Sequence, residues 1–336
     1  MTLYSIGDMA QTYMMRRQNV ELKQQMARLT TELSSGRTAD LAKHLKGEYA
    51  LVADLEHRLG LLDSYGFAAK EAKMFTGAMQ SALGNIQDRS SDYALQLVAV
   101  GGTELPSVIA STSASAKSNL GSLVNSLNAT VAGRALFSGV AIDSPALNSA
   151  DDILAELRIA AAGQTTHSGV IAAVDAWFTT PGGGFDTLAY AGSAQAIAPF
   201  QLGEGESVDL DLRANNPALR DLLHATSLAA LAGDASLGLP PLVQSSLLTT
   251  AGEAMLNAQD NLTALRADLG YAESRIEESA VRIASESTAT EYARGELLSV
   301  DPYEAATRLE SVQFQLETLY TLTVRTSRLS LMEYMR

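Results

Sequence analysis

The sequence contains no cysteine, so disulfide bonds, thiol catalysis and cysteine-ligated zinc sites are excluded together. Aromatic residues are also scarce, at 6% of 336 residues, which favours long helices packed through small and aliphatic side chains. No run of about 18 apolar residues is present to form a membrane span. The first residues do not show the basic head and apolar run of a cleaved signal peptide. We therefore expect a cytosolic protein, or one exported without a cleaved signal.

Basic residues are outnumbered, with 24 Lys and Arg against 38 Asp and Glu, which gives a formal net charge of -14. Such a chain is repelled by nucleic-acid phosphates and by anionic membrane surfaces. Arg16–Arg17 is the only adjacent basic pair, so we find no local patch that would reverse this. We predict neither a nucleic-acid partner nor a membrane partner.

Patterns of catalytic chemistry are missing as well. The four histidines lie at no metal-ligand spacing on a helix, and the sequence has no H-E-x-x-H motif and no phosphate-binding loop. Gly203-Glu204-Gly205-Glu206 lacks the third glycine and the strand–helix context of a dinucleotide loop. We predict that the protein is not an enzyme, and we assign no catalytic, cofactor-binding or metal-binding residue.

What the sequence does contain is helical periodicity near both ends. In the first region, apolar side chains at 4-3-4 spacing share one face of a helix: Leu22, Met26, Leu29 and Leu33. Ser34-Ser35-Gly36 then predicts a helix end with glycine as the C-terminal cap. A second stripe from Val52 to Leu97 predicts a long helix, and a further helix is expected at about 108–132.

The middle of the chain, about 140–241, has a different composition. Six of the eight prolines fall there, and Ser207–Leu212 alternates polar and apolar residues as a half-buried strand does. We expect 196–202 as its partner strand and short helices at about 152–162 and 217–231, with Pro217 in the first turn of the second. This region predicts a small inserted α+β domain.

The last region returns to helix. Asp301-Pro302 predicts a break, with Asp301 as N-cap and Pro302 at the first helical position. The following stripe holds four apolar side chains on one face: Leu309, Val312, Leu316 and Leu319. Because stripes at both ends need a partner, we predict that the terminal segments pair as a coiled coil.

The predicted fold is therefore mainly α, a long antiparallel helical rod or coiled coil formed by the N- and C-terminal segments, with the small α+β domain inserted. The expected division has three parts: terminal axial helices at 1–45 plus 298–336, a helical rod domain at 46–139 plus 242–297, and the inserted domain at 140–241.

Four motifs in order carry a family resemblance. They are Leu33-Ser34-Ser35-Gly36-Arg37; Asn128 followed by Gly133-Arg134-Ala135-Leu136-Phe137-Ser138-Gly139; Asp301 with Glu304, Ala305, Leu309, Gln313 and Tyr320; and the ending Leu329-Ser330-Leu331-Met332-Glu333-Tyr334-Met335. The chain resembles the bacterial flagellin family, and within it the hook–filament junction group known as hook-associated protein 3. The resemblance covers both termini and the helical core, about two thirds of the chain.

The resemblance implies a structural component of the bacterial flagellum that joins hook to filament as a ring of subunits. It implies a secreted, extracellular protein, exported through the flagellar type III channel with a dedicated chaperone. The implied partners are copies of the chain, another hook-associated protein on the hook side and flagellin on the filament side. The terminal stripes, together with Leu331, become the expected assembly interface, and Ser35, Gly36, Arg37, Gly133, Arg134, Phe137, Ser138 and Gly139 the family-motif residues.

Two alternatives stay open at this point. The first is flagellin itself, the subunit of the filament. Two elements favour the junction group over it: Leu136-Phe137-Ser138-Gly139 and the ending Tyr334-Met335-Arg336. The second is a cytosolic coiled-coil scaffold, which explains the stripes but not the ordered motifs.

Overall fold

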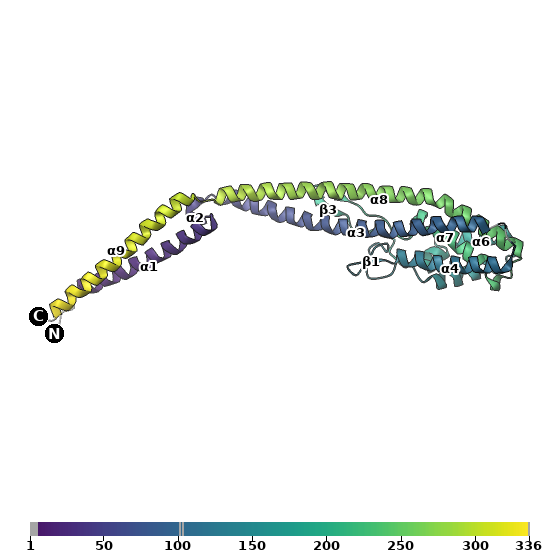
Figure 1. The fold of residues 1–336 in the computed structure, drawn as a ribbon, viewed down its shortest axis with the longest axis horizontal. Helices are drawn as coiled ribbons and strands as arrows, with labels where there is room; N and C mark the ends of the chain where they lie inside the picture. Colours follow the sequence, from purple (N-terminus) through teal and green to yellow (C-terminus); the bar gives the residue numbers. More distant parts are fainter. Residues whose placement is uncertain (1–5, 101, 103, 335–336) are drawn as a thin grey trace. The chain divides into compact units, whose positions relative to one another are not determined.

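The computed structural model describes residues 6–100, 102 and 104–334, and the fold is mainly helical (Figure 1). The elements in chain order are α1 (Ile6–Ser35), α2 (Leu41–His44), α3 (Ala50–Val100), α4 (Pro106–Leu127), β1 (Thr130–Val131), β2 (Arg134–Ala135), α5 (Ala150–Ala161), α6 (His167–Thr179), the π-helix η1 (Phe185–Ala189), β3 (Phe200–Gly203), β4 (Glu206–Val208), α7 (Pro217–Ala232), the 3₁₀-helix η2 (Ala235–Leu237), α8 (Pro241–Leu298) and α9 (Pro302–Tyr334). The predicted class is confirmed, because long helices from the two ends of the chain pack together around small inserted strands and helices.

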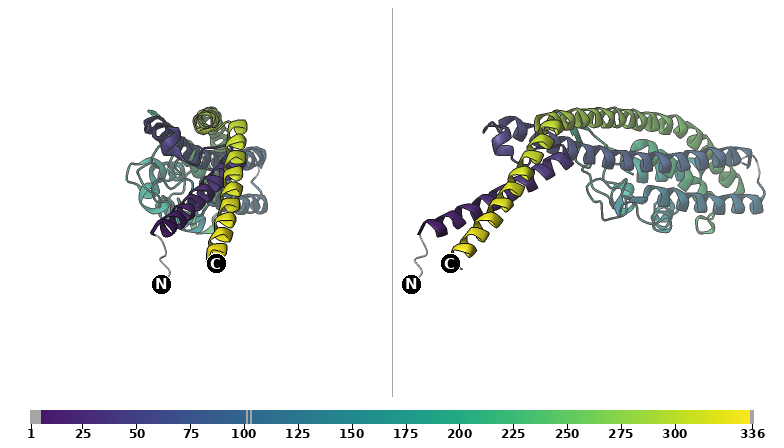
Figure 2. Two further views of the ribbon diagram at one scale, coloured as in Figure 1. Left: turned by 90° about the vertical axis from the view of Figure 1, so that its left-hand side faces the viewer. Right: turned by 60° about the vertical axis from the view of Figure 1, so that its left-hand side comes forward.

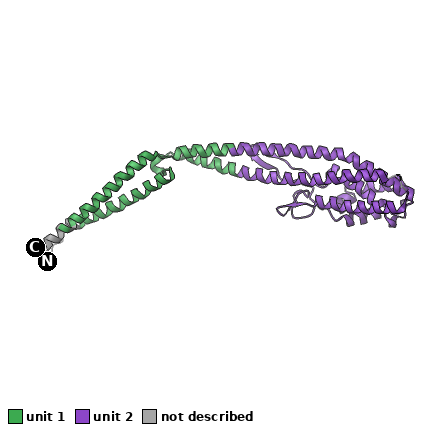
Figure 3. Cartoon of the chain, viewed as in Figure 1, with its two compact units in different colours: residues 1–63, 285–336 green, residues 64–284 purple. Residues whose placement is uncertain are grey.

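The chain divides into two compact units, residues 1–63 with 285–336 and residues 64–284 (Figure 3). Each unit contains one part of α3 and one part of α8, because both helices run past the boundary. The three-part division expected from the sequence stays a prediction.

In the first unit, α1 and α9 lie side by side (Figures 1 and 2). They run antiparallel, since Thr323 near the end of α9 meets Met15 near the start of α1, at 3.9 Å between Oγ1 and Sδ. The predicted caps are found at the C-terminal end of α1 and at the N-terminal end of α9. The N–H of Gly36 donates to Glu32 with φ of +67° at the end of α1, and the carboxylate of Asp301 accepts from the N–H of Tyr303 at 2.8 Å at the start of α9.

In the second unit, α3 and α8 pack along each other. Polar side chains add to the apolar contacts, for example Gln80, whose Nε2 donates to the carbonyl of Arg266 at 2.8 Å. Gly252 allows the two helices to approach closely, because a Cβ there would lie 2.9 Å from a methyl group of Val98. These contacts hold two long uninterrupted helices together, since α3 has 51 residues and α8 has 58.

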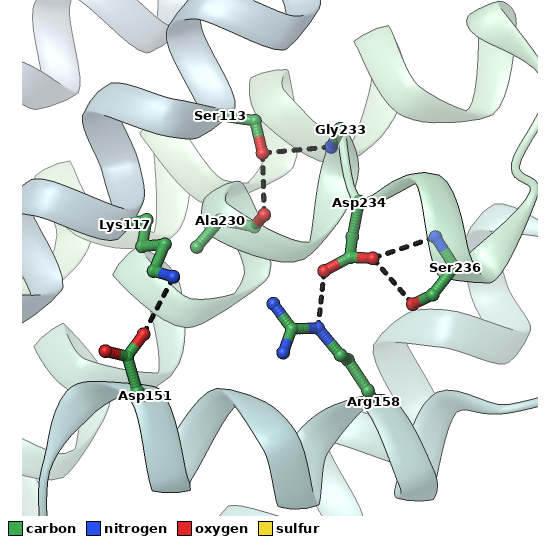
Figure 4. Close-up of polar contacts among 8 residues, drawn as sticks. All are labelled: Ser113, Lys117, Asp151, Arg158, Ala230, Gly233, Asp234 and Ser236. Atoms are coloured by element: carbon green, nitrogen blue, oxygen red, sulfur yellow. Dashed lines mark hydrogen bonds and ion pairs between the residues drawn. The ribbon is translucent and has the colours of Figure 1, made fainter.

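The inserted helices are fixed to α4 by polar contacts (Figure 4). The hydroxyl of Ser113 on α4 donates to the carbonyl of Ala230 at 2.6 Å and accepts from the N–H of Gly233 at 3.0 Å, so it caps the end of α7. Two ion pairs of the same region reach α5: Lys117–Asp151 at 2.7 Å and Arg158–Asp234 at 2.5 Å.

The strands of the second unit form two short antiparallel hairpins, β1–β2 and β3–β4. The β3–β4 hairpin is held to α8 by Glu206, which pairs with Arg282 and accepts from the hydroxyl of Ser279 at 2.9 Å. These bonds lower the pKa of Glu206, with the Arg282 hydrogen bond as the largest cause. Phe200 of β3 packs against Phe75 of α3, with ring centroids 6.2 Å apart.

Candidate assembly surface

The seam between α1 and α9 gathers the two stripes that the sequence predicts. Leu22 is buried against Val312, Leu316 and Leu319, with three partly buried neighbours from α1 around them: Met15, Met26 and Leu29. A single chain therefore buries the core of the α9 stripe against α1, which agrees with the predicted pairing of the terminal segments. The stripe is first of all the contact within one subunit.

The outer members of the predicted stripes are less buried. Leu309 is half-buried, whereas Leu33 is 40% exposed. At this level an open groove of about 580 Å³, lined largely by polar side chains, lies between α1, α2 and α9, so apolar contact ends before Leu33. Leu331 lies within α9, but its side chain is outside those that the structure describes.

Polar contacts help to align α1 with α9 along the seam, the buried contact between these two helices. Tyr320, one of the family-motif positions on α9, is hydrogen-bonded to Asn19 and Lys23 of α1. The bond with Asn19 is the larger and that with Lys23 the smaller cause of a lowered pKa of the Tyr320 hydroxyl. The Lys23 ammonium also lies 5.9 Å from the Tyr320 ring centroid.

A second set of apolar side chains on the same two helices faces away from the seam. These are more than 45% exposed in the single chain: Met9, Tyr13, Met14, Val20, Tyr303, Phe314, Leu322 and Val324. Phe314 illustrates the geometry, because it is two residues from both Val312 and Leu316 and a helix turns about 100° per residue. This set was not predicted above, because the prediction rested on one stripe on each helix. Apolar residues outside that register were the available signal.

The joint after α1 places Ser35, Gly36 and Arg37 beside the break between α8 and α9. Arg37 forms an isolated antiparallel bridge with Ser299, and the N–H of Val300 donates to the carbonyl of Gly36 at 3.1 Å. The left-handed φ of Gly36 lets the chain make this turn without strain. The motif Ser35-Gly36-Arg37 therefore ties the two terminal helices together at one end.

The second motif begins with a two-residue hairpin turn. Ala132 and Gly133, at φ of +50° and +78°, connect β1 to β2, which is the pattern of a type I′ turn. Arg134 follows, and its guanidinium pairs with Glu71 and lies 4.7 Å from the centroid of the Phe75 ring. The hairpin is thereby fixed to α3.

The rest of this motif lies where several loops are joined to it by backbone hydrogen bonds. Phe137 is fully buried, and its carbonyl accepts from the N–H of Ala214 at 2.9 Å. The Ser138 hydroxyl donates to the carbonyl of Ala141 at 2.8 Å. Asn128 bonds both backbone groups of Leu147, at 2.8 and 2.9 Å. The motif thus joins the end of α4 to the inserted domain, and its residues have structural contacts in the single chain.

Gly139 offers a direct stability test. Its φ is +66°, and a Cβ added there would overlap the carbonyl oxygen of Gln195. We expect Gly139→Ala to lower the free energy of unfolding of the second unit by about 1–3 kcal/mol from backbone strain alone, with the overlap adding to it. Urea unfolding measures this. Gly121→Ala is the matched control, because a Cβ at that position in α4 meets open space. Its free energy of unfolding should be equal to or higher than that of the wild type. Equal stability of the two variants would contradict this role of Gly139.

No arrangement of catalytic chemistry emerges around the histidines. His224 of α7 is half-buried against α6, with Nε2 2.7 Å from Asp175, and desolvation lowers its pKa while Asp175 and Asp221 oppose this. His167 bonds Thr250 at 2.9 Å. Among the described residues, no group of three or more His, Cys, Asp or Glu side chains could hold a metal ion. In the same part of the chain, no helix is long and apolar enough to cross a membrane.

Comparison with known families supports the flagellar interpretation of the sequence. The sequence model of the bacterial flagellin C-terminal helical region matches residues 253–335, which hold most of α8 and nearly all of α9. The chain carries a flagellin C-terminal region. No curated protein sequence matches it.

This match supports a structural role of the flagellin kind in the flagellum. Proteins of this family are structural and not enzymatic, and they are located in the extracellular flagellum, where they assemble with other flagellar subunits. The matched segment contains the Asp301–Pro302 break and the buried side chains of α9, so the flagellin-like part includes one half of the seam.

Proposed function

We propose that this flagellin-family chain joins the hook to the filament as a ring of identical subunits. The observation that carries the proposal is the element Leu136-Phe137-Ser138-Gly139, which follows Asn128 and Gly133 as in the junction group that the sequence resembles. Residues of this element bond to Ala141, Ser193 and Ala214, so the element has a structural role within the chain.

The terminal pair supplies the assembly surface in this proposal. The seam holds α1 and α9 together within a subunit, and the exposed apolar side chains around it contact neighbouring copies. Each apolar side chain fully buried between subunits contributes about 1.5–3 kcal/mol. An exposed apolar set of this extent on two adjacent helices is typical of an interaction surface. The stripe residues act indirectly, since they set the spacing of the two helices.

The proposed partners follow from position in the flagellum. One side of the ring contacts another hook-associated protein, and the other side contacts flagellin. Before assembly, an export chaperone covers the terminal segments, and the chain leaves through the flagellar type III channel. The division into terminal helices (1–45 and 298–336), rod (46–139 and 242–297) and insert (140–241) belongs to this proposal.

Flagellin itself is the second candidate, since the match at residues 253–335 fits either role. A cytosolic scaffold is disfavoured, because the family belongs to the extracellular flagellum. The two flagellar roles differ in the location of the protein in the flagellum and in its copy number there.

The proposal is tested in a strain from which the gene is deleted, and in the same strain after the gene is restored. We expect the deletion strain to make hooks, release flagellin into the medium and grow no filaments, and the full chain to restore filaments. Antibody labelling in electron microscopy should mark only the boundary of hook and filament. Labelling along the whole filament would instead assign the chain as a filament subunit and contradict the junction role.

A further inference from the structure

The methionines of this chain are concentrated at its ends. Seven of the ten lie within the first 26 or the last five residues: Met1, Met9, Met14, Met15, Met26, Met332 and Met335. The chain has no cysteine, so methionine is its only sulfur. Most of the oxidisable sulfur of this chain therefore lies in its terminal segments.

Two of the terminal methionines whose side chains the structure describes are open to solvent in the single chain. Met9 is 66% exposed and Met14 is 63% exposed, and both lie on α1 away from the Leu22 seam. Met15 and Met26 are partly covered by the seam instead. In the second unit, Met74 is 44% exposed, while Met79 and Met255 are at most 1% exposed.

We propose that Met9 and Met14 are oxidation sites at which a peroxide converts the thioether to methionine sulfoxide and thereby weakens assembly of the subunits. The effect on assembly rests on the proposed function, because it requires that the exposed face of the terminal pair contacts neighbouring copies.

The chemistry needs no group from the protein beyond the thioether. A sulfur lone pair attacks one peroxide oxygen, an S–O bond forms, the O–O bond breaks, and water leaves. The sulfur loses two electrons and the peroxide gains them. The product replaces a flexible apolar side chain by a polar one, which no longer gains from burial between subunits. Methionine sulfoxide reductases reverse the step, one enzyme for each sulfoxide epimer.

Exposure also gives an order of reaction within one chain. Among the methionines whose exposure the structure describes, Met9 and Met14 react first, Met74 follows, and Met79 and Met255 react last, because peroxide must reach the sulfur. Met74 is the internal comparison, since it is accessible but lies in α3, outside the terminal pair.

The experiment uses the purified full chain treated with hydrogen peroxide and then freed of it. Peptide mass spectrometry measures oxidation at each methionine, and sedimentation velocity measures self-association before and after treatment. We expect oxidation at Met9 and Met14 to weaken self-association at least about tenfold, which corresponds to about 1.4 kcal/mol. Treatment with both reductases should restore it.

Two variants locate the effect, each compared with its own unoxidised form. Met9→Leu combined with Met14→Leu should lose most of the sensitivity to peroxide, and Met74→Leu should keep it. The assignment is overturned if the oxidised wild type associates as before, if the double variant stays equally sensitive, or if Met74→Leu protects as well. A chain that does not self-associate even before oxidation would instead overturn the proposed assembly, and the effect on assembly with it.

Discussion

Cells whose only copy of this protein carries Leu316→Asp are expected to swim no better than a deletion strain, with hooks present and flagellin released into the medium. Leu316 is 6% exposed, in the seam with Leu22, Val312 and Leu319. Its loss removes about 1.5–3 kcal/mol of apolar burial. The aspartate adds the cost of a charge in an apolar seam without a partner. The pairing of α1 with α9 then fails, whereas residues 64–284 keep a core of their own.

Two neighbouring substitutions separate pairing from assembly. Phe314 is 71% exposed, so Phe314→Asp should keep the helix content and thermal unfolding of the wild type and still impair filament growth. Gln315→Asp introduces the same charge at an exposed polar position and should swim normally. Helix content is measured by circular dichroism, and swimming is measured in soft agar. Normal swimming of the Leu316→Asp strain would show that the seam is not needed for incorporation.

The local signals of the sequence predicted the terminal helices well, because they act within a few residues. Gly36 and Asp301 are found as the expected caps of α1 and α9. The inner members of the predicted stripes share the buried seam, where Leu22 meets Leu316, whereas Leu33 is 40% exposed. Periodicity on its own does not say whether the partner of a stripe belongs to the same chain, and here it does.

Errors appear where a distant segment decides the local structure. The helix expected at 108–132 ends at Leu127, because Asn128 bonds Leu147 and the chain then turns into the β1–β2 hairpin. The strand expected over 207–212 ends at Val208, since β3 offers only four residues to pair with. The burial alternation nevertheless continues at Leu210 and Leu212.

One cap could have been found from the sequence. Ser149 caps α5, because its hydroxyl accepts from the N–H of Asp152 at 3.2 Å. A serine three residues before an acidic residue is a known start signal. The exposed apolar set on α1 and α9 was harder to predict, because such residues look the same as scattered surface apolar residues until the seam is known.

Deleting residues 1–35 should abolish export, so that the protein stays in the cell and is missing from the culture supernatant. The deletion removes the segment that, by resemblance to the family, carries an uncleaved export signal. It also removes α1, which leaves Val312, Leu316 and Leu319 without their contact to Leu22. Immunoblots of cells and supernatant measure the distribution of the protein.

The two consequences of the deletion are separated by Leu22→Asp. This variant keeps the whole segment but places a charge in the seam, where Leu22 is 5% exposed. If the export signal lies in the segment itself, Leu22→Asp should still reach the supernatant although it does not assemble. Retention of both proteins would assign the export defect to the lost pairing of α1 with α9. Undiminished export of the truncated chain would show that recognition by the export channel depends on residues after Ser35.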